Sequence, residues 1–281
     1  MSRFAPDWLA LREPYDCAAR SAALANRFAA AVGARPHLID LGCGTGANLR
    51  YLASRIAGAQ RWRCIDHDGA LLEAARAALQ DWGVREGWPD RSDGDDVTVA
   101  RRGGAIAVTF ALGDLARDGL PDDSDVTGLS ASALLDLTSA DWLQTLAGRY
   151  FGTPLLMALS FDGRLAFEPA APADDEIRAR FVAHQRSDKG FGRALGPDAA
   201  PYLADLLVAR GCKVALEQTD WHLGPDDGPL LRATIEGIVG VVREAAHDSG
   251  LEHWVRLRHQ QLAADDLRLT VGHLDLLALP G

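Results

Sequence analysis

A run of small residues between Ile39 and Asn48 carries the strongest chemical signal in the sequence. It reads Ile-Asp-Leu-Gly-Cys-Gly-Thr-Gly-Ala-Asn and lies between a predicted strand, His37–Leu41, and a predicted helix from about Ala47 to Ala57. Glycine has no Cβ to keep a ligand off the backbone, and it tolerates positive φ. The spacing therefore predicts a tight turn where a nucleotide-like ligand can lie against the backbone and the start of a helix.

Asp40 indicates which nucleotide this turn suits. Gly42, Gly44 and Ala47 also satisfy the template of dinucleotide-binding turns, so the glycines alone leave NAD or FAD open. A carboxylate two residues before the first glycine would oppose a pyrophosphate, whereas it would attract the sulfonium and ammonium groups of S-adenosylmethionine. The charge of Asp40 therefore favours S-adenosylmethionine.

The same run resembles motif I of the class I S-adenosylmethionine-dependent methyltransferases, an acid followed by three alternating glycines. The motif stands complete as Asp40, Gly42, Gly44 and Gly46. The resemblance implies an α/β fold with a Rossmann-like, seven-stranded, mostly parallel sheet between helices, and S-adenosyl-L-methionine as the cofactor. Cys43 and Asn48 belong to this turn and are predicted to lie at the cofactor as well.

Asp66 follows the predicted second strand, Arg61–Ile65. It comes a little over the ~20 residues after the turn at which a ribose-binding acid is expected, and two carboxylate oxygens can accept both ribose hydroxyl protons. The resemblance gives Asp66 that role, with His67 beside it, while Asp68 is better placed to cap the next helix. The alternative is that both acids only cap this helix.

The segment Gly113-Asp114-Leu115 ends the predicted third strand. By resemblance, Asp114 accepts a hydrogen bond from the adenine amino group, and Leu115 lines the adenine pocket and offers its backbone N–H. The alternative is an ordinary Gly-Asp turn.

The run from Leu129 to Asp136, which follows the predicted fourth strand, matches the family's region facing the methyl group. This match predicts a cofactor contact at Ser130 and a catalytic role for Asp136. The run lacks the Asn/Asp-Pro-Pro-Tyr/Phe signature of nucleic-acid amino methyltransferases.

Two further segments are candidates for the acceptor side. His184 begins a stretch that runs to Arg193 and combines cations with glycines, which suits a lid over the acceptor with His184 as a base; a solvated loop is the alternative. Arg12 and Arg20 lie in the N-terminal helix, where an arginine can bind the methionine carboxylate of the cofactor. Surface ion pairs with neighbouring acids are an equal alternative.

Composition excludes several classes of protein. The chain has 281 residues, is 48% hydrophobic and carries a net charge of -10, which repels nucleic acids and anionic membrane surfaces. No apolar stretch approaches the ~20 residues of a membrane span, and no signal peptide is visible. The cysteines form no C-x-x-C pair, which argues against a zinc site and a disulfide framework and favours the cytoplasm.

The elements predict a single domain over residues 1–281 with three additions. These are an N-terminal helical cap (1–33, with one helix over Pro6–Val32), a lid-like segment (168–197) and a helical insertion between the last two strands (224–268). The insertion is predicted to be one long helix or two helices broken near Asp248 to Gly250. The last two strands, Cys212–Leu223 and Leu269–Leu279, fall where the family places an antiparallel pair, with the final strand inserted between the fifth and sixth.

The predicted function is methyl transfer to an oxygen or nitrogen of a small-molecule acceptor. An NAD(P)-dependent oxidoreductase and a non-catalytic protein that retains the cofactor turn are the alternatives. Neither nucleic acid, membrane nor metal is an expected partner. The apolar face of the insertion could pack on the core, close a pocket or bury against a second copy in a homodimer.

Overall fold

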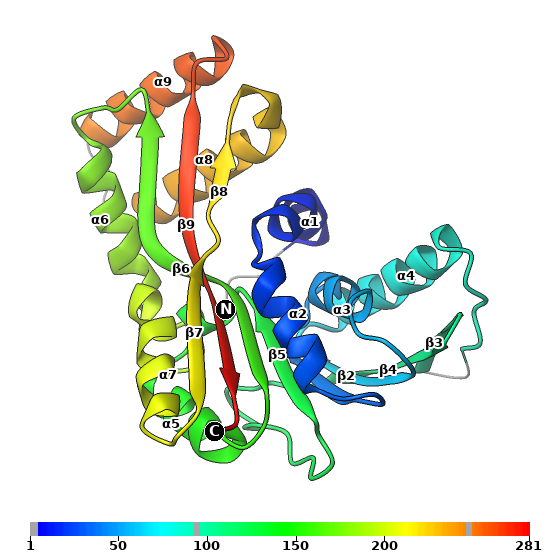
Figure 1. Ribbon diagram of the computed structural model, residues 1–281. Coiled ribbons are helices and arrows are strands. Elements are labelled where there is room, and N and C mark those ends of the chain that lie inside the picture. Colours follow the sequence, from blue (N-terminus) through cyan, green and yellow to red (C-terminus); the bar gives the residue numbers. More distant parts are fainter. Residues whose placement is uncertain (1–4, 93–95, 246–248) are drawn as a thin grey trace.

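One twisted sheet runs through the whole molecule (Figure 1). The computed structural model describes residues 5–92, 96–245 and 249–281, and in this part of the chain the sheet has nine strands in the order β3-β4-β2-β1-β5-β6-β9-β7, with β8 paired to β9. The strands are β1 (His37–Leu41), β2 (Gln60–Asp66), β3 (Asp96–Arg101), β4 (Gly104–Leu112), β5 (Gly128–Ser132), β6 (Leu155–Glu168), β7 (Lys213–Gln218), β8 (Trp221–Leu223) and β9 (Arg268–Leu279).

The centre of the sheet is parallel. β1 pairs with β2 and β5, and β4 and β6 continue the parallel pairing on either side. β9 is antiparallel and lies between β6 and β7. The predicted fold class and the inserted final strand are therefore confirmed, and the strand count exceeds seven because β3 and β8 add short antiparallel strands to the core set.

Helices cover both faces of this sheet, as expected for parallel strands. Leu38 of β1 packs with α2, α3 and α4, and its neighbour Ile39 packs with α5 and α7 on the opposite face. The helices are α1 (Pro6–Ala19), α2 (Ala22–Ala31), α3 (Ala47–Ala53), α4 (Gly69–Arg85), α5 (Ala140–Tyr150), α6 (Asp174–Gln185), α7 (Ala199–Val208), α8 (Gly228–Ala245) and α9 (Ser249–Ala263). Among the described residues, no helix is both long and apolar enough to cross a membrane.

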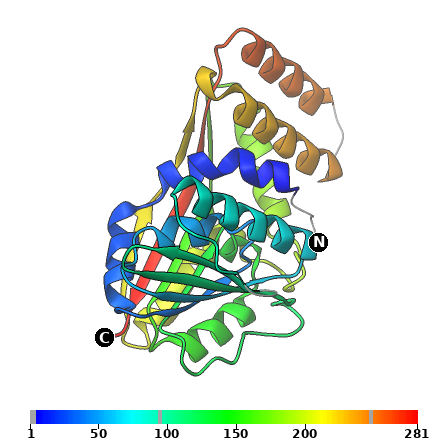
Figure 2. The same ribbon diagram turned by 90° about the vertical axis from the view of Figure 1, so that its right-hand side faces the viewer.

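β6 and β9 are long strands that continue beyond the carboxyl edge of the parallel sheet, where α8 and α9 pack beside them (Figures 1 and 2). In this extension, residues 165–168 of β6 and the whole of β8 both pair with the first half of β9. A separate hydrophobic cluster fills the space under α6, α8 and α9. The fully buried Arg258 of α9 ties the helices together, because its guanidinium binds Asp174 of α6 and the carbonyl of Pro169.

Two predicted elements are interrupted in the structure. The predicted helix Pro6–Val32 ends at Ala19, since Ser21 starts a new helix by accepting the Leu24 N–H at 3.0 Å. The predicted strand Cys212–Leu223 breaks at Thr219, whose hydroxyl turns inward to the buried Asp275.

One predicted strand is longer than the strand in the structure, and one predicted helix break lies partly outside the described residues. The predicted fourth strand, Asp125–Leu135, is shorter in the structure, where it spans Gly128–Ser132, and it ends early because the chain turns at Ala133, which has a φ of 52°. Two helices, α8 and α9, do form the insertion. Of the predicted break at Asp248 to Gly250, Asp248 lies outside the described residues, whereas Ser249 and Gly250 begin α9.

Candidate functional site

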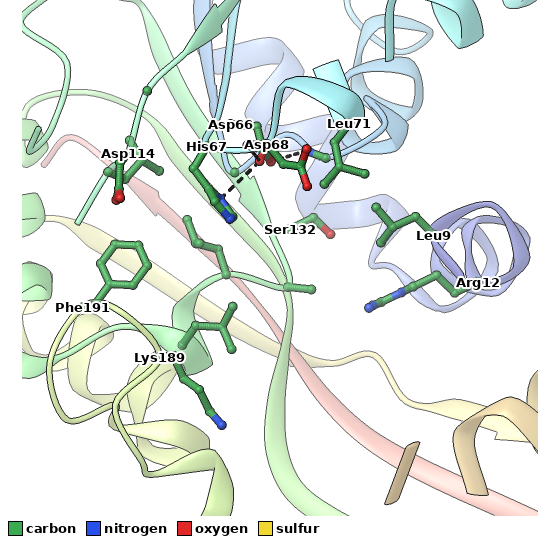
Figure 3. Close-up of a pocket in the computed structure, with 17 residues that line it drawn as sticks. Leu9, Arg12, Asp66, His67, Asp68, Leu71, Asp114, Ser132, Lys189 and Phe191 are labelled. Atoms are coloured by element: carbon green, nitrogen blue, oxygen red, sulfur yellow. Dashed lines mark hydrogen bonds and ion pairs between the residues drawn. The ribbon is translucent and has the colours of Figure 1, made fainter. Parts of the chain in front are cut away.

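Two adjoining cavities lie at the carboxyl edge of the parallel strands. The first has a volume of about 140 Å³ and collects residues that follow β1, β2, β4 and β5 (Figure 3). The second has a volume of about 340 Å³ and lies toward the sheet extension. Four residues line both cavities: Arg12, Ala133, Leu137 and Lys189.

The glycine turn forms one wall of the first cavity. Gly42, Gly44 and Gly46 have φ values of 62°, 53° and 74°, so the motif supplies glycine where the backbone is left-handed. Gly42 and Gly44 line the cavity, whereas Gly46 begins α3 behind it. A Cβ on Gly44 would lie 3.3 Å from Leu9 of α1, so the turn and the N-terminal helix approach closely.

Asp66 holds the glycine turn in place and also lines the first cavity. Its Oδ2 accepts the Gly44 N–H at 2.8 Å, and its Oδ1 accepts the Asp68 N–H at 3.0 Å. Each carboxylate oxygen has two lone pairs, so both oxygens keep an acceptor site for a ligand hydroxyl. His67 lies beside the same carboxylate, with its Nδ1 3.4 Å from Oδ1. Asp68 caps α4 through the Ala70 N–H, as predicted, and lines the cavity as well.

Three amides of the turn are already bonded within the protein. The Cys43 N–H donates to the carbonyl of Ile65, and the Gly46 N–H donates to that of Cys43. With the Gly44 N–H held by Asp66, these three donors have partners before any ligand arrives. A pyrophosphate at this turn would need such amides and would also meet a carboxylate.

Asp40 lies beneath the turn and not in the cavity wall. It is fully buried, and one of its oxygens accepts hydrogen bonds from the side chains of Asn48 and Ser130. Burial raises its pKa to about 6, with the two hydrogen bonds acting in the opposite direction. Asp40, Asn48 and Ser130 therefore form a network that supports the turn from behind. Cys43 is also buried away from the cavity.

The predicted adenine side is assembled at the end of β4. Gly113, Asp114 and Leu115 all line the first cavity. The carboxylate of Asp114 accepts the Ala116 N–H at 3.0 Å, which is the Gly-Asp turn that the alternative interpretation describes, yet the side chain still borders the cavity. Phe191 faces this region from the lid-like segment (Figure 3), its ring packed edge-on against Trp142.

The two N-terminal arginines have different environments. Arg12 lines both cavities, binds Asp16 through Nε at 2.8 Å and Nη2 at 3.2 Å, and lies over the ring of Trp221. Arg20 is buried outside both cavities, 4.1 Å from the centre of the Tyr51 ring, because the chain turns into α2 at this point. The structure therefore brings Arg12, and not Arg20, to the candidate site.

The second cavity draws on all three predicted additions to the core fold. Trp8 and Arg12 come from the cap, Phe181 and His184 from the lid-like segment, and Ile238 from the helical insertion. Its walls are mostly apolar. The aromatic and aliphatic side chains that line it include Trp8, Leu159, Phe161, Leu165, Phe181, Trp221, Ile238, Val241 and Val271.

Both predicted catalytic residues line the second cavity. Asp136 is buried, its Oδ1 has no partner among the described residues, and burial raises its pKa to about 6. His184 is not a free base, because its Nδ1 lies 3.1 Å from the ammonium of Lys189 and its Nε2 lies 3.4 Å from a carboxylate oxygen of Glu244. The ring nitrogen nearest Lys189 must accept from the ammonium.

Some cavity residues give no chemical signal in the sequence. Leu9 appears as an ordinary apolar helix residue, and His273 is one histidine in an apolar strand. His273 lines the second cavity beside Trp221, and burial lowers its pKa to about 3, so the imidazole is neutral. His273 is placed there by the pairing of β6 with β9, in which it lies opposite Phe161, another residue of the cavity wall.

No protein-family model and no curated protein sequence matches the chain. Among solved structures, it is similar to an S-adenosylmethionine-dependent methyltransferase from Geobacter sulfurreducens in complex with S-adenosylhomocysteine, with 16% identity over 99% of both chains and a TM-score of 0.45. It is also similar to geranyl diphosphate C-methyltransferase from Streptomyces coelicolor, with 11% identity over 92% of this chain and 80% of that chain and a TM-score of 0.45. A phosphoethanolamine N-methyltransferase from Haemonchus contortus has 14% identity over 91% of this chain and 53% of that chain, with a TM-score of 0.40.

Proposed function

We propose that this chain is an S-adenosylmethionine-dependent methyltransferase whose acceptor is an oxygen or nitrogen atom of a small molecule. The observation that carries the proposal is the hydrogen bonding of the backbone amides in the glycine turn. The amides of Cys43, Gly44 and Gly46 have partners within the protein, and the carboxylate that holds the Gly44 amide, that of Asp66, lines the cavity beside the turn. A ligand with ribose hydroxyls and a cationic sulfur suits this wall better.

The lining residues divide into groups that fit the parts of this cofactor. Asp66 would accept the ribose hydroxyls, and Asp114, Leu115 and Phe191 would enclose the adenine. Arg12 uses Nε and Nη2 to bind Asp16, so it would bind the methionine carboxylate through its remaining nitrogen, Nη1.

S-adenosylmethionine would supply a methyl carbon on a sulfonium, which bonds to the acceptor's lone pair while the carbon–sulfur electron pair returns to sulfur as a thioether. Such an in-line displacement is accelerated mainly by alignment and by exclusion of water. The protein's part is to hold the acceptor in the second cavity against the shared residues Ala133 and Leu137. We propose that the cap (1–33), the lid-like segment (168–197) and the insertion (224–268) together form this acceptor site. The four cysteines are free, which supports the reducing cytoplasm as the proposed location of the protein.

Calorimetric titration with S-adenosylhomocysteine and with NADH tests the proposal. We expect binding of the first ligand in the micromolar range and no heat from the second. Saturable binding of NADH alone would overturn the proposal in favour of an oxidoreductase. Binding of S-adenosylhomocysteine without methylation of any compound in a metabolite extract would favour the non-catalytic alternative.

A further inference from the structure

The charged groups of the second cavity gather where it meets the first. Arg12 and Lys189 line both cavities, and Asp136 interacts electrostatically with each of them. Figure 3 shows Arg12 on the N-terminal helix and Lys189 on the lid-like segment, at different sides of the first cavity. The acceptor atom must lie at this junction, because only there can it approach a methyl group held in the first cavity.

The remainder of the second cavity selects an apolar molecule. The rings of Trp8, Phe161, Phe181 and Trp221 line it together with aliphatic side chains. Of its other polar lining residues, Gln185 and Thr234 are uncharged and His273 has a neutral imidazole, so these three provide no charge. A flat ring system gains most from such walls, since aromatic faces bury large areas at little cost in side-chain entropy.

The charges at the junction discriminate among acceptor groups. An ammonium would face Lys189 and Arg12, whereas a carboxylate would meet the buried, unpartnered oxygen of Asp136. A hydroxyl suits both kinds of neighbour. It can donate its proton to Asp136 and, as negative charge develops on the oxygen, the ammonium of Lys189 stabilises that charge.

We propose that the acceptor is an apolar ring compound with an acidic hydroxyl, a phenol or an enol, whose oxygen lies between Asp136 and Lys189. This proposal rests on the proposed function. The hydroxyl proton passes to the carboxylate of Asp136, the oxygen forms the bond to the methyl carbon, and the sulfonium becomes a neutral thioether. The products are a methyl ether and a protonated Asp136, which returns its proton to solvent.

His184 and Glu244 act as positioning residues in this arrangement. The ring of His184 accepts from the Lys189 ammonium, and the exposed Glu244 carboxylate lies against the other side of the ring. Partial burial lowers the pKa of Lys189, while the charges of Glu244 and Asp136 favour its ammonium form. His184 and Glu244 thus hold the ammonium of Lys189 at the junction of the two cavities.

A matched set of naphthalene probes tests the proposal. 2-Naphthol, 2-naphthylmethylamine, 2-naphthoic acid and naphthalene are titrated into the protein with and without saturating S-adenosylhomocysteine. We expect 2-naphthol to bind at least about tenfold more tightly than the other three. Its absorption spectrum also reports ionisation, and we expect bound naphthol to ionise about one pH unit or more below free naphthol, a tenfold shift in the equilibrium.

Variants assign the effect to named residues. Lys189→Ala is expected to return the ionisation of bound naphthol toward its free value, and Asp136→Asn is expected to weaken naphthol binding severalfold. Lys213→Ala is the matched control, because Lys213 is the only other lysine in the sequence and lies exposed at the start of β7. It should leave both measurements unchanged.

Two results would overturn the proposal: tighter binding of the amine or the carboxylic acid, or an unshifted ionisation of bound naphthol. Failure of every probe to bind would overturn it as well. The proposed function fails by a separate result, the absence of binding heat from S-adenosylhomocysteine. In that case the probe titrations without S-adenosylhomocysteine still report on the second cavity.

Discussion

Asp66 holds the glycine turn in place, and it is also the residue that we propose binds the ribose of the cofactor. Its two oxygens hold the Gly44 and Asp68 amides, and the same oxygens face the first cavity. Asp66→Ala should therefore weaken binding of S-adenosylhomocysteine by one or two charge-assisted hydrogen bonds, about 1.5 to 3 kcal/mol each. Calorimetry measures the loss, and thermal unfolding of the free variant measures how much of it comes from loosening the turn. Asp90→Ala, at an exposed site outside both cavities, is the control, and unchanged affinity in Asp66→Ala would remove this residue from the site.

Asp136, the proposed proton acceptor, is a buried carboxylate, and its burial costs stability at neutral pH. Its pKa is raised to about 6 from an ordinary value of 3.8, so the folded state keeps a proton that the unfolded chain releases between these pH values. Stability from this group is therefore present below about pH 4 and is lost as the pH rises through about 6. Asp136→Asn should have little effect at pH 4 and should raise the free energy of unfolding at pH 8 by on the order of 1 to 3 kcal/mol.

Urea denaturation at the two pH values measures this difference. Asp175→Asn, on the exposed start of α6, should show no such pH-dependent gain. The same Asp136→Asn variant should lose methylation of a hydroxyl acceptor, because the amide cannot take the proton. The assignment would be contradicted if the stability difference between the variant and the unmodified protein were the same at both pH values, or if the variant stayed fully active.

At the scale of elements, Asp275 joins three segments around the second cavity. One of its oxygens accepts the Ser21 N–H between α1 and α2, and the other accepts the Leu159 N–H of β6 and the hydroxyl of Thr219 before β8. Leu159 has a φ of 53° and lines the cavity, so this carboxylate holds a strained backbone in place.

Asp275→Ala should therefore lower the free energy of unfolding by about 2 to 5 kcal/mol, because it leaves several buried donors without a partner. Urea denaturation provides the measurement. Glu217→Ala offers a matched control, since Glu217 binds the Ser21 hydroxyl at the surface and its loss should cost about 0.5 kcal/mol or less. Equal losses in the two variants would show that burial of Asp275 adds nothing.

The sequence predicted elements better than it predicted their ends. Hydrophobic periodicity and glycines located the strands and most helices, and the resemblance supplied the order of the core strands. The breaks at Ser21 and Thr219 escaped, because both depend on Asp275, a residue more than fifty positions away from either one. A local pattern cannot report such a distant partner.

The candidate site shows the same division. Asp66 and Asp114 follow strand ends, so the sequence could place them at the carboxyl edge. The sequence could not separate Arg12 from Arg20, because helical spacing does not reveal where the helix ends and the chain turns under it. Leu9 and His273 became visible only when distant elements were brought together.

At the scale of the molecule, the half that contains the first cavity and the half that contains the second cavity share two long strands. β6 and β9 run from the parallel sheet into the extension, so the strand pairing of each half depends on the same two strands. The extension's helices pack on these same strands, and α1 borders both cavities. We therefore expect the two halves to unfold together as one cooperative unit.

Hydrogen exchange by mass spectrometry under increasing urea can test this cooperativity. Amides of β1 and of the extended part of β6 should converge on one opening free energy. S-adenosylhomocysteine at about 100 times its dissociation constant stabilises the folded state by about 2.7 kcal/mol, and exchange in both strands should therefore slow by about 100-fold. Because the ligand would touch only the first cavity, protection of β6 beyond it can arise only through shared unfolding. Slower exchange in β1 with unchanged exchange between residues 165 and 168 would instead show two independent halves.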